Sequence, residues 1–233
     1  MLALLPDWAH PVADYMAKEG LKGTARVAAF SLLASVLVGI PLGTLLTIRF
    51  LPTRALIRLY IEVWRGLPII VTILAIFFVL PKLSGRFEFD AFTSASIGLS
   101  LWGSAQVAEA TRGAVQSIPR EQHEAAAALG FGWLGRHVFL ILPQALRRLL
   151  PPLVSLLVNI IQNTTIAAVI GANELLESAK RSNERLVAPP PVGLGENHAF
   201  ELYGAVAVVF FLISFPLTRL AAYLESRLQR EGV

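Results

Sequence analysis

The stretch Val27-Ala-Ala-Phe-Ser-Leu-Leu-Ala-Ser-Val-Leu-Val-Gly-Ile-Pro-Leu-Gly-Thr-Leu-Leu-Thr-Ile48 runs for 22 residues without a charged side chain. A helix needs about 20 predominantly apolar residues to cross the hydrocarbon core of a bilayer, which is about 30 Å thick. This stretch is long enough to do so. It predicts a transmembrane helix and places the chain among integral membrane proteins.

The composition of the whole chain agrees with this class. Of its 233 residues, 55% are hydrophobic and 15% are charged, whereas a soluble domain carries roughly 25% charged residues. The formal net charge is +4, but the basic residues are scattered between apolar blocks and form no patch that could bind nucleic acid. The chain has no Cys, which excludes disulfides, thiolate metal sites and cysteine nucleophiles. A soluble enzyme and a nucleic-acid-binding protein are both disfavoured.

Four further apolar stretches follow the first. Three of them are long enough, or nearly so, to span a bilayer alone, and the fourth, Gly66–Pro81, becomes long enough if its helix begins near Ala55. We therefore expect an all-α integral membrane protein with five transmembrane helices, near residues 24–49, 55–80, 92–117, 150–171 and 202–224.

The distribution of Lys and Arg predicts the orientation, because cytoplasmic loops retain positive charge. With the N-terminus outside, 11 of these residues lie in inner segments, 8 lie in outer segments, and Arg65 lies within a span. We therefore expect an extracytoplasmic segment at 1–22, a transmembrane domain at 23–225 with a cytoplasmic loop at 118–149, and a cytoplasmic tail at 226–233.

The long inner loop is expected to contain two short helices. Ser117-Ile-Pro119 has the composition of a helix start, with Ser as the cap, and the Ala-rich run that follows favours a helix ending at Gly130. A second helix is expected from Trp133 to Ile141, with Leu142-Pro143 as its end. Two helices joined at a glycine form an elbow, and its alanine face suits close packing into a partner's groove.

The outer segment at 172–201 has two parts of different composition. Asn173 to Leu186 has the pattern of a short polar helix. The run Ala188-Pro-Pro-Pro-Val-Gly-Leu-Gly195 is too rich in proline and glycine to continue it.

The inner loop resembles the EAA loop of ABC importer permeases. The resemblance rests on Glu124-Ala125-Ala126, followed after three residues by Gly130 and after nine more by Leu140-Ile-Leu142-Pro143. Leu140 stands where that pattern has Ile. Three other stretches resemble the polar amino acid family of the histidine, glutamine, glutamate and arginine type: 60–68, 108–119 and 173–175. Gln162-Asn163-Thr164-Thr165 differs from the Lys-Asp-Thr-Ser that this family often has, and the Pro-rich outer segment is longer than usual.

The resemblance implies a type I ABC importer permease fold in a bacterial cytoplasmic (inner) membrane. It also implies partners: a second permease copy or homologue, two cytoplasmic ATPase subunits and an extracytoplasmic solute-binding protein. The sequence has no Gly-x4-Gly-Lys-Ser/Thr motif, so ATP and Mg are expected on the ATPase and no cofactor or catalytic site on this chain. No metal site is expected either. The residues expected to couple to the ATPase are Glu124, Ala125, Ala126 and Gly130.

Two charge pairs lie within the expected spans. Glu62 and Arg65 are three residues apart, as are Glu109 and Arg112, so each pair shares one helix face. Charges within a membrane are costly and usually face a bundle interior or a cavity. Three interpretations remain open: an ion-pair cluster that braces the second and third helices, an inner gate, or contact with the solute.

Polar residues on the third and fourth expected spans define a candidate solute path. Hydroxyls and amides recur on one stripe of each helix, and transporter sites lie near the bilayer midplane where such groups converge. The alternative is that they only form hydrogen bonds with neighbouring helices. The candidates are Ser100, Ser104, Gln106, Asn159, Gln162, Asn163 and Thr164.

The leading hypothesis is therefore the transmembrane subunit of an ATP-driven, binding-protein-dependent importer of polar amino acids. Neutral amides and hydroxyls on the fourth span favour glutamate or glutamine as the solute, since a cationic solute would need a fixed carboxylate there. One alternative is a permease for basic amino acids or another small polar solute. Another is an ATP-independent secondary carrier or channel, which would leave the elbow without a role.

Overall fold

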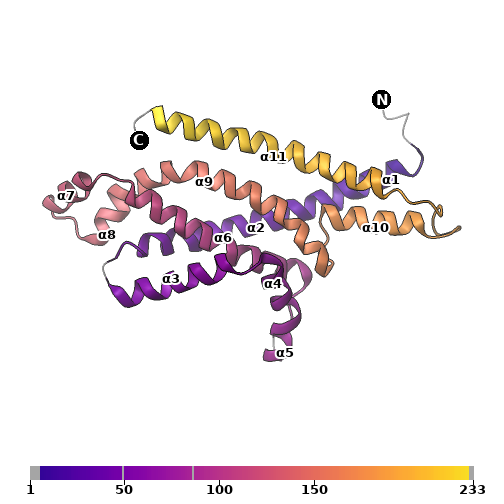
Figure 1. The fold of residues 1–233 in the computed structure, drawn as a ribbon, viewed down its shortest axis with the longest axis horizontal. Helices are drawn as coiled ribbons and strands as arrows, with labels where there is room; N and C mark the ends of the chain where they lie inside the picture. Colours follow the sequence, from indigo (N-terminus) through magenta and orange to yellow (C-terminus); the bar gives the residue numbers. More distant parts are fainter. Residues whose placement is uncertain (1–5, 49, 86, 231–233) are drawn as a thin grey trace. The chain divides into compact units, whose positions relative to one another are not determined.

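The computed structural model describes residues 6–48, 50–85 and 87–230, and all of the regular secondary structure in these ranges is helical. Figure 1 traces the helices in chain order. The described chain divides into two compact units, one containing residues 6–30, 69–99 and 159–216 and the other residues 31–68, 100–158 and 217–230.

The first expected span begins earlier than the sequence indicated. α1 (Ala9–Tyr15), the π-turn η2 (Met16–Leu21) and α2 (Lys22–Leu45) form one continuous helix. The residues before Lys22 thus extend the spanning helix, because nothing between Ala9 and Lys22 breaks the helical hydrogen bonds.

The prediction of a single helix over 55–80 is wrong. α3 (Leu51–Gly66) ends before Leu67-Pro68, and α4 (Ile69–Leu74), η3 (Ala75–Val79) and α5 (Leu80–Ser84) follow. Leu67 is extended, with φ −80° and ψ 136°. A proline disfavours the helical conformation of the residue before it, so Pro68 ends α3.

Among the described residues, length and composition assign three helices that can cross a membrane: Ala9–Leu45, Trp133–Ile170 and Ala199–Arg230, the last being α11. The number becomes four if α3 and the helices after Pro68 form one broken span. α6 (Ala91–Gln116) is long enough, but its hydroxyl residues and its Glu109/Arg112 pair lower its hydropathy. Five spans are compatible with this fold, and composition alone does not assign the fifth.

The inner loop differs from expectation at two residues. Ser117 does not cap α7 (Arg120–Ala128), because its hydroxyl donates to the carbonyl of Ala114 at 2.8 Å. Pro143 does not end a helix: α8 (Trp133–Arg136), η4 (His137–Ile141) and α9 (Leu142–Asn163) are continuous, followed by the 3-10 turn η5 (Thr164–Ile170). In η4 the N–H of Leu142 bonds the carbonyl of His137, and this wider turn relieves the clash that Pro143 would cause in a regular helix.

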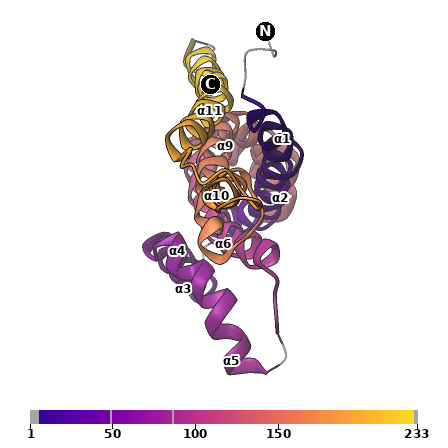
Figure 2. The same ribbon diagram turned by 90° about the vertical axis from the view of Figure 1, so that its right-hand side faces the viewer.

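The first unit has two apolar cores. One joins α2, α4, α6 and η5 through Val27, Ile73, Leu99 and Ile170. The other joins η2, α10 (Leu175–Val187) and α11 through Met16, Leu175 and Leu202, together with Ala179, Leu186 and Val206. Figure 2 shows α10 beside α1, in agreement with its contacts to α1 and η2. The predicted polar helix at 173–186 is thus present, and the Pro-rich segment after it is not helical.

The second unit packs α2 tightly against α6. Gly39 and Gly43 lie one helical turn apart, and a Cβ on either would come within 3.0 Å of α6 atoms. Small residues four positions apart permit this approach in membrane helices. A further core beside this contact contains Leu46, Ile57 and Ile61 with Ala105 and Ala108.

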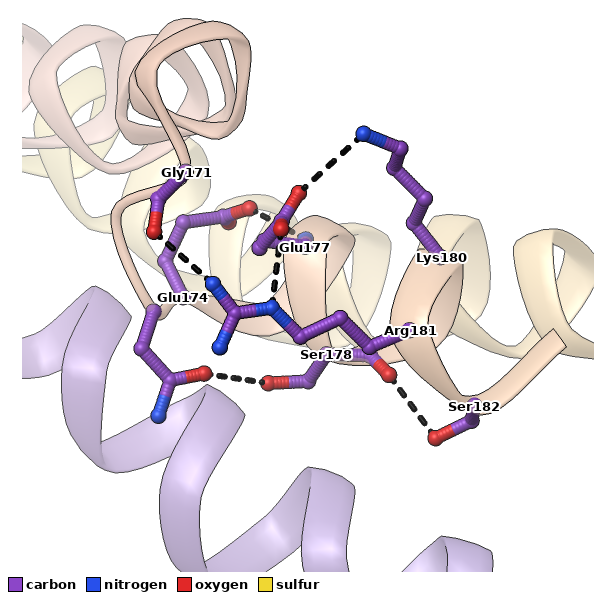
Figure 3. Close-up of polar contacts among 8 residues, drawn as sticks. Gly171, Glu174, Glu177, Ser178, Lys180, Arg181 and Ser182 are labelled. Carbon is purple, nitrogen blue, oxygen red and sulfur yellow. Dashed lines mark hydrogen bonds and ion pairs between the residues drawn. The ribbon is translucent and has the colours of Figure 1, made fainter. Parts of the chain in front are cut away.

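A buried polar network fixes the start of α10 (Figure 3). Glu174 is 0% exposed, and one carboxylate oxygen accepts from the backbone N–H of Glu177 at 2.6 Å. Arg181 donates to Glu177 at 2.9 Å and to the carbonyl of Gly171 at 3.0 Å. The other oxygen of Glu174 has no hydrogen-bond partner among the described residues. Burial raises the pKa of Glu174, the N–H groups at the helix start oppose this rise, and Glu177 adds to it.

This raised pKa predicts a pH-dependent stability. Because the pKa of Glu174 is higher in the folded chain than in the unfolded chain, its contribution is complete below the unfolded pKa and is lost as pH rises through the folded pKa. We expect Glu174→Gln, which keeps an acceptor for the Glu177 N–H, to raise the thermal unfolding midpoint at about pH 8 and to flatten its dependence between about pH 5 and pH 8. Glu184→Gln, at an exposed position of the same helix, is the control. An unchanged pH profile in Glu174→Gln would contradict this role.

Candidate functional site

The elbow between α7 and α8 turns at Gly130. Its φ is +84°, a conformation that favours glycine, as the sequence predicted. The N–H of Gly130 bonds the carbonyl of Ala127 at 3.0 Å, and the N–H of Phe131 bonds that of Ala126 at 3.1 Å. These two bonds form the Schellman arrangement, which satisfies the last carbonyls of α7 and fixes the direction of the chain.

One face of the elbow packs inward and the other is free. Ala126 is fully buried, whereas Ala125 is exposed and the Glu124 side chain is 63% exposed. Glu124 pairs with Arg120 at 2.7 Å. Large apolar side chains continue the exposed face beyond the turn, with Leu129 74% and Leu134 68% exposed. The exposed face of the elbow therefore consists largely of alanine and leucine side chains.

The inner side of the elbow is held by polar and ring contacts. Arg136 donates to the carbonyl of His123 at 3.3 Å, and Trp133 stacks on His137 with 4.2 Å between ring centroids. Burial lowers the pKa of His123, and the charge of Arg136 lowers it further. His137 donates to or accepts from Thr47 at 3.1 Å through Nε2, which ties η4 to the end of the first long helix. The two arms of the elbow are thus held together, and the hydrogen bond to Thr47 anchors them next to the end of the first long helix.

The two charge pairs of the sequence have different surroundings. Arg112 binds Glu109 through two bonds of 3.0 and 2.6 Å and also bonds Gln116. Glu62 and Arg65 are exposed, and within the described ranges they form no ion pair with each other. Arg65 nevertheless lies close enough to Glu109 for an electrostatic interaction. The structure thus pairs Glu109 with Arg112 and places Arg58 and Arg65 within electrostatic range of Glu109.

The candidate path residues of α6 are largely used in packing. Ser104 is 2% exposed, shares a hydrogen bond of 2.7 Å with the Tyr60 hydroxyl and donates to the carbonyl of Leu101 at 2.9 Å. The backbone carbonyl of Ser100 accepts from Ser35 at 3.5 Å. Gln106 is half-buried. For Ser104, these contacts match the alternative of hydrogen bonds between helices.

The candidates at the end of α9 are more accessible. Asn159 and Gln162 are exposed, and Gln162 donates weakly to the hydroxyl of Ser214 at 3.4 Å. Asn163 is half-buried. Thr164 is 0% exposed and donates to the carbonyl of Ile161, so its hydroxyl is already satisfied. Asn159, Gln162 and Asn163 remain the amides that a solute or a partner can reach.

The sequence did not predict the role of Glu174. The motif Asn173-Glu174-Leu175 was visible, but a glutamate before a helix usually indicates an exposed position, and its burial depends on packing against the first long helix. Thr24 of that helix accepts from the N–H of Leu175 at 3.1 Å.

Among the described residues no group of three or more His, Cys, Asp or Glu side chains could hold a metal ion.

Comparisons with known proteins agree with this geometry. Residues 35–230 match the family described as "Binding-protein-dependent transport system inner membrane component". The glutamine transport system permease protein GlnP of Escherichia coli (strain K12) is 34% identical over 211 residues, which cover 91% of this chain and 92% of GlnP. A probable glutamine ABC transporter permease protein of Bacillus subtilis (strain 168), also named GlnP, is 30% identical over 209 residues, 90% of this chain and 92% of that protein.

A solved structure supports the same assignment. The crystal structure of an amino acid ABC transporter with histidines has a chain that superposes with a TM-score of 0.79 at 26% identity, covering 96% of this chain and all of that one. The EAA spacing, the elbow at Gly130 and the apolar helices are thus found together in a chain whose sequence and fold both match one family. This protein belongs to the family of binding-protein-dependent transport system inner membrane components.

Proposed function

We propose that this chain is the transmembrane subunit of an ATP-driven importer that takes up glutamine or glutamate from an external binding protein. Two relatives, 34% and 30% identical over about nine-tenths of the chain, are named for glutamine transport. The accessible amides Asn159, Gln162 and Asn163 are neutral and can both donate to a carboxylate and accept from an ammonium group. This chemistry suits a zwitterionic or acidic amino acid.

The observation that carries the proposal is the elbow at Gly130. The short helix α7 has an exposed alanine face and is closed by a glycine with positive φ, which is the shape of a coupling element rather than of a lipid-facing segment. In this proposal Glu124 and Ala125 contact a cytoplasmic ATPase, while the buried Ala126 and the turn at Gly130 hold the elbow in the shape that this contact needs. That subunit binds ATP and Mg and performs the hydrolysis, and this chain has no catalytic site of its own.

The assembly follows from the same proposal. Two permease copies, or this chain and a homologue, form the pathway, two ATPases bind their elbows, and the binding protein docks on the outer side. The N-terminus lies outside and the C-terminus lies in the cytoplasm.

Reconstitution with these partners in liposomes tests the proposed assembly. Uptake should require both ATP and the binding protein. Uptake that persists without ATP would assign the chain to the secondary carriers instead.

The elbow predicts a position-specific loss of coupling. We expect Gly130→Val to abolish ATP-dependent uptake at unchanged membrane abundance, because a β-branched residue at φ +84° is strongly disfavoured. Gly132 lies two residues away at φ −64° with open space around it, so Gly132→Val is the matched control and should retain uptake. Equal uptake in the two variants would remove Gly130 from the coupling mechanism.

The Glu109–Arg112 pair predicts a non-additive loss of folded protein. Removing one charge leaves the other uncompensated in a poorly solvated position, so Glu109→Gln and Arg112→Gln should each lower the folded yield more than the double variant does. The same cycle at Glu62 and Arg65, which are exposed, should be additive. Additive losses at both pairs would show that Glu109 and Arg112 act independently.

The solute can be identified by competition. Uptake of labelled glutamine, in a strain without other amino acid importers, should be suppressed by excess glutamine or glutamate and little affected by arginine. The reason is the absence of an acidic group among the accessible residues at the end of α9, where a cationic side chain would need one. Arginine uptake that resists excess glutamine and glutamate would refute this assignment.

A further inference from the structure

A pocket of about 400 Å³ opens between the first half of α9 and the last turns of α11, within the second unit. On α9 it is lined by residues three or four positions apart, which share one helix face, and on α11 by a matching face. The side chains of Pro152, Ser155 and Ala221 are too short to fill the space between the two helices. The residues that define it are Arg148, Pro152, Ser155, Ala221, Glu225 and Gln229.

The pocket contains opposite charges that are not paired with each other. Arg148 donates through Nη1 to the backbone carbonyl of Ser117 at 2.6 Å and to its hydroxyl at 2.8 Å, which holds the guanidinium in place. Arg148 is half-buried, lines the pocket and forms no ion pair within the described ranges. Glu225 is exposed and forms no ion pair within the described ranges. A fixed cation and a free carboxylate therefore line the same space.

Pro152 adds a backbone acceptor to this set. It lies inside α9 and lacks an N–H, so the carbonyl of Arg148, four residues earlier, loses its helical hydrogen-bond partner. In a membrane protein such a carbonyl needs another donor. An ammonium group in the pocket could supply one.

The depth of the pocket indicates the kind of ligand. About 20 residues of α11 cross the hydrocarbon, so a span that starts at Leu202 ends a few residues before Glu225. On α9, Arg148 directly precedes the uncharged run that begins at Leu149. Both charges thus lie where the hydrocarbon ends and the lipid headgroups begin, a level at which basic pockets between helices bind lipid phosphates.

We propose that this pocket binds the phosphoethanolamine headgroup of a phospholipid, with the phosphate on Arg148 and the ammonium on Glu225 and the backbone carbonyl of Arg148. Phosphatidylcholine offers no N–H donor to Glu225, and phosphatidylglycerol offers no cation. A free amino acid carries the same two charges without acyl chains, and the experiment separates the two sources. The assignment to the inner leaflet rests on the orientation proposed above, whereas the headgroup chemistry does not.

The test is native mass spectrometry of the assembled transporter, purified with equal amounts of phosphatidylethanolamine, phosphatidylcholine and phosphatidylglycerol. The unmodified complex should retain phosphatidylethanolamine through delipidation. Glu225→Gln and Arg148→Gln should each reduce its occupancy about tenfold, the effect of losing one charge-assisted contact. Arg147→Gln, which removes an exposed arginine from the same helix outside the pocket, should leave the occupancy unchanged.

Three results would overturn the proposal. Equal retention of phosphatidylcholine would show that no ammonium N–H is recognised. If Arg147→Gln lowered the phosphatidylethanolamine occupancy as much as the pocket variants, the effect would be one of general surface charge. A mass shift with free glutamine that disappears in Glu225→Gln would assign the pocket to an amino acid. Glu225 lies at an exposed helix end, so its variant should fold even if Arg148→Gln does not, and it then carries the test alone.

Discussion

The satisfaction of backbone hydrogen bonds in a medium without water is the constraint on which the rest of this structure depends. In hydrocarbon an unpaired N–H or carbonyl costs several kcal/mol, so a spanning chain must be helical except where the protein itself supplies partners. The helices here are accordingly long. The helices Ala9–Leu45 and Trp133–Ile170 each continue through a π-turn rather than break. The breaks that do occur are closed locally, as at Gly130 and Gly171, where a glycine with positive φ returns the last N–H groups to the helix.

Buried charged groups are under the same constraint, because they too need a partner within the protein. Glu109 finds its cation one turn away on its own helix, so the pair needs no second element to be correctly placed. Glu174 has no such partner and depends on the N–H groups at the start of α10. Arg181 holds Glu177 and the Gly171 carbonyl together, and it thereby joins the end of η5 to α10. The exposed Glu62 and Arg65 need no compensation inside this chain.

Three sequence predictions failed because each considered one residue and its favoured local role. Ser117 was expected to cap α7, but its hydroxyl and carbonyl are used by Ala114 and Arg148. Pro143 was expected to end a helix, but the π-turn before it makes room for its ring. The span over 55–80 was expected to be continuous because hydropathy was weighed above Pro68, whose effect on Leu67 is local and strong. The same rule, applied at Leu67, would have given the correct break.

The sequence by itself determined the helical membrane class, the elbow with its positive-φ glycine, the Glu109–Arg112 pair and the short polar helix before the Pro-rich segment. Each of these depends on contacts within a few residues, or on hydropathy, which a single chain displays directly.

Tertiary structure decided which polar groups remain available for contacts with a ligand and which are used within the chain. Ser104 is taken by Tyr60 from 44 residues away. Glu174 is buried against a helix that precedes it by about 150 residues, and Arg148 and Glu225 share one pocket. Helical periodicity shows which face a side chain occupies, but the partner on that face comes from a distant part of the chain, and only packing selects it.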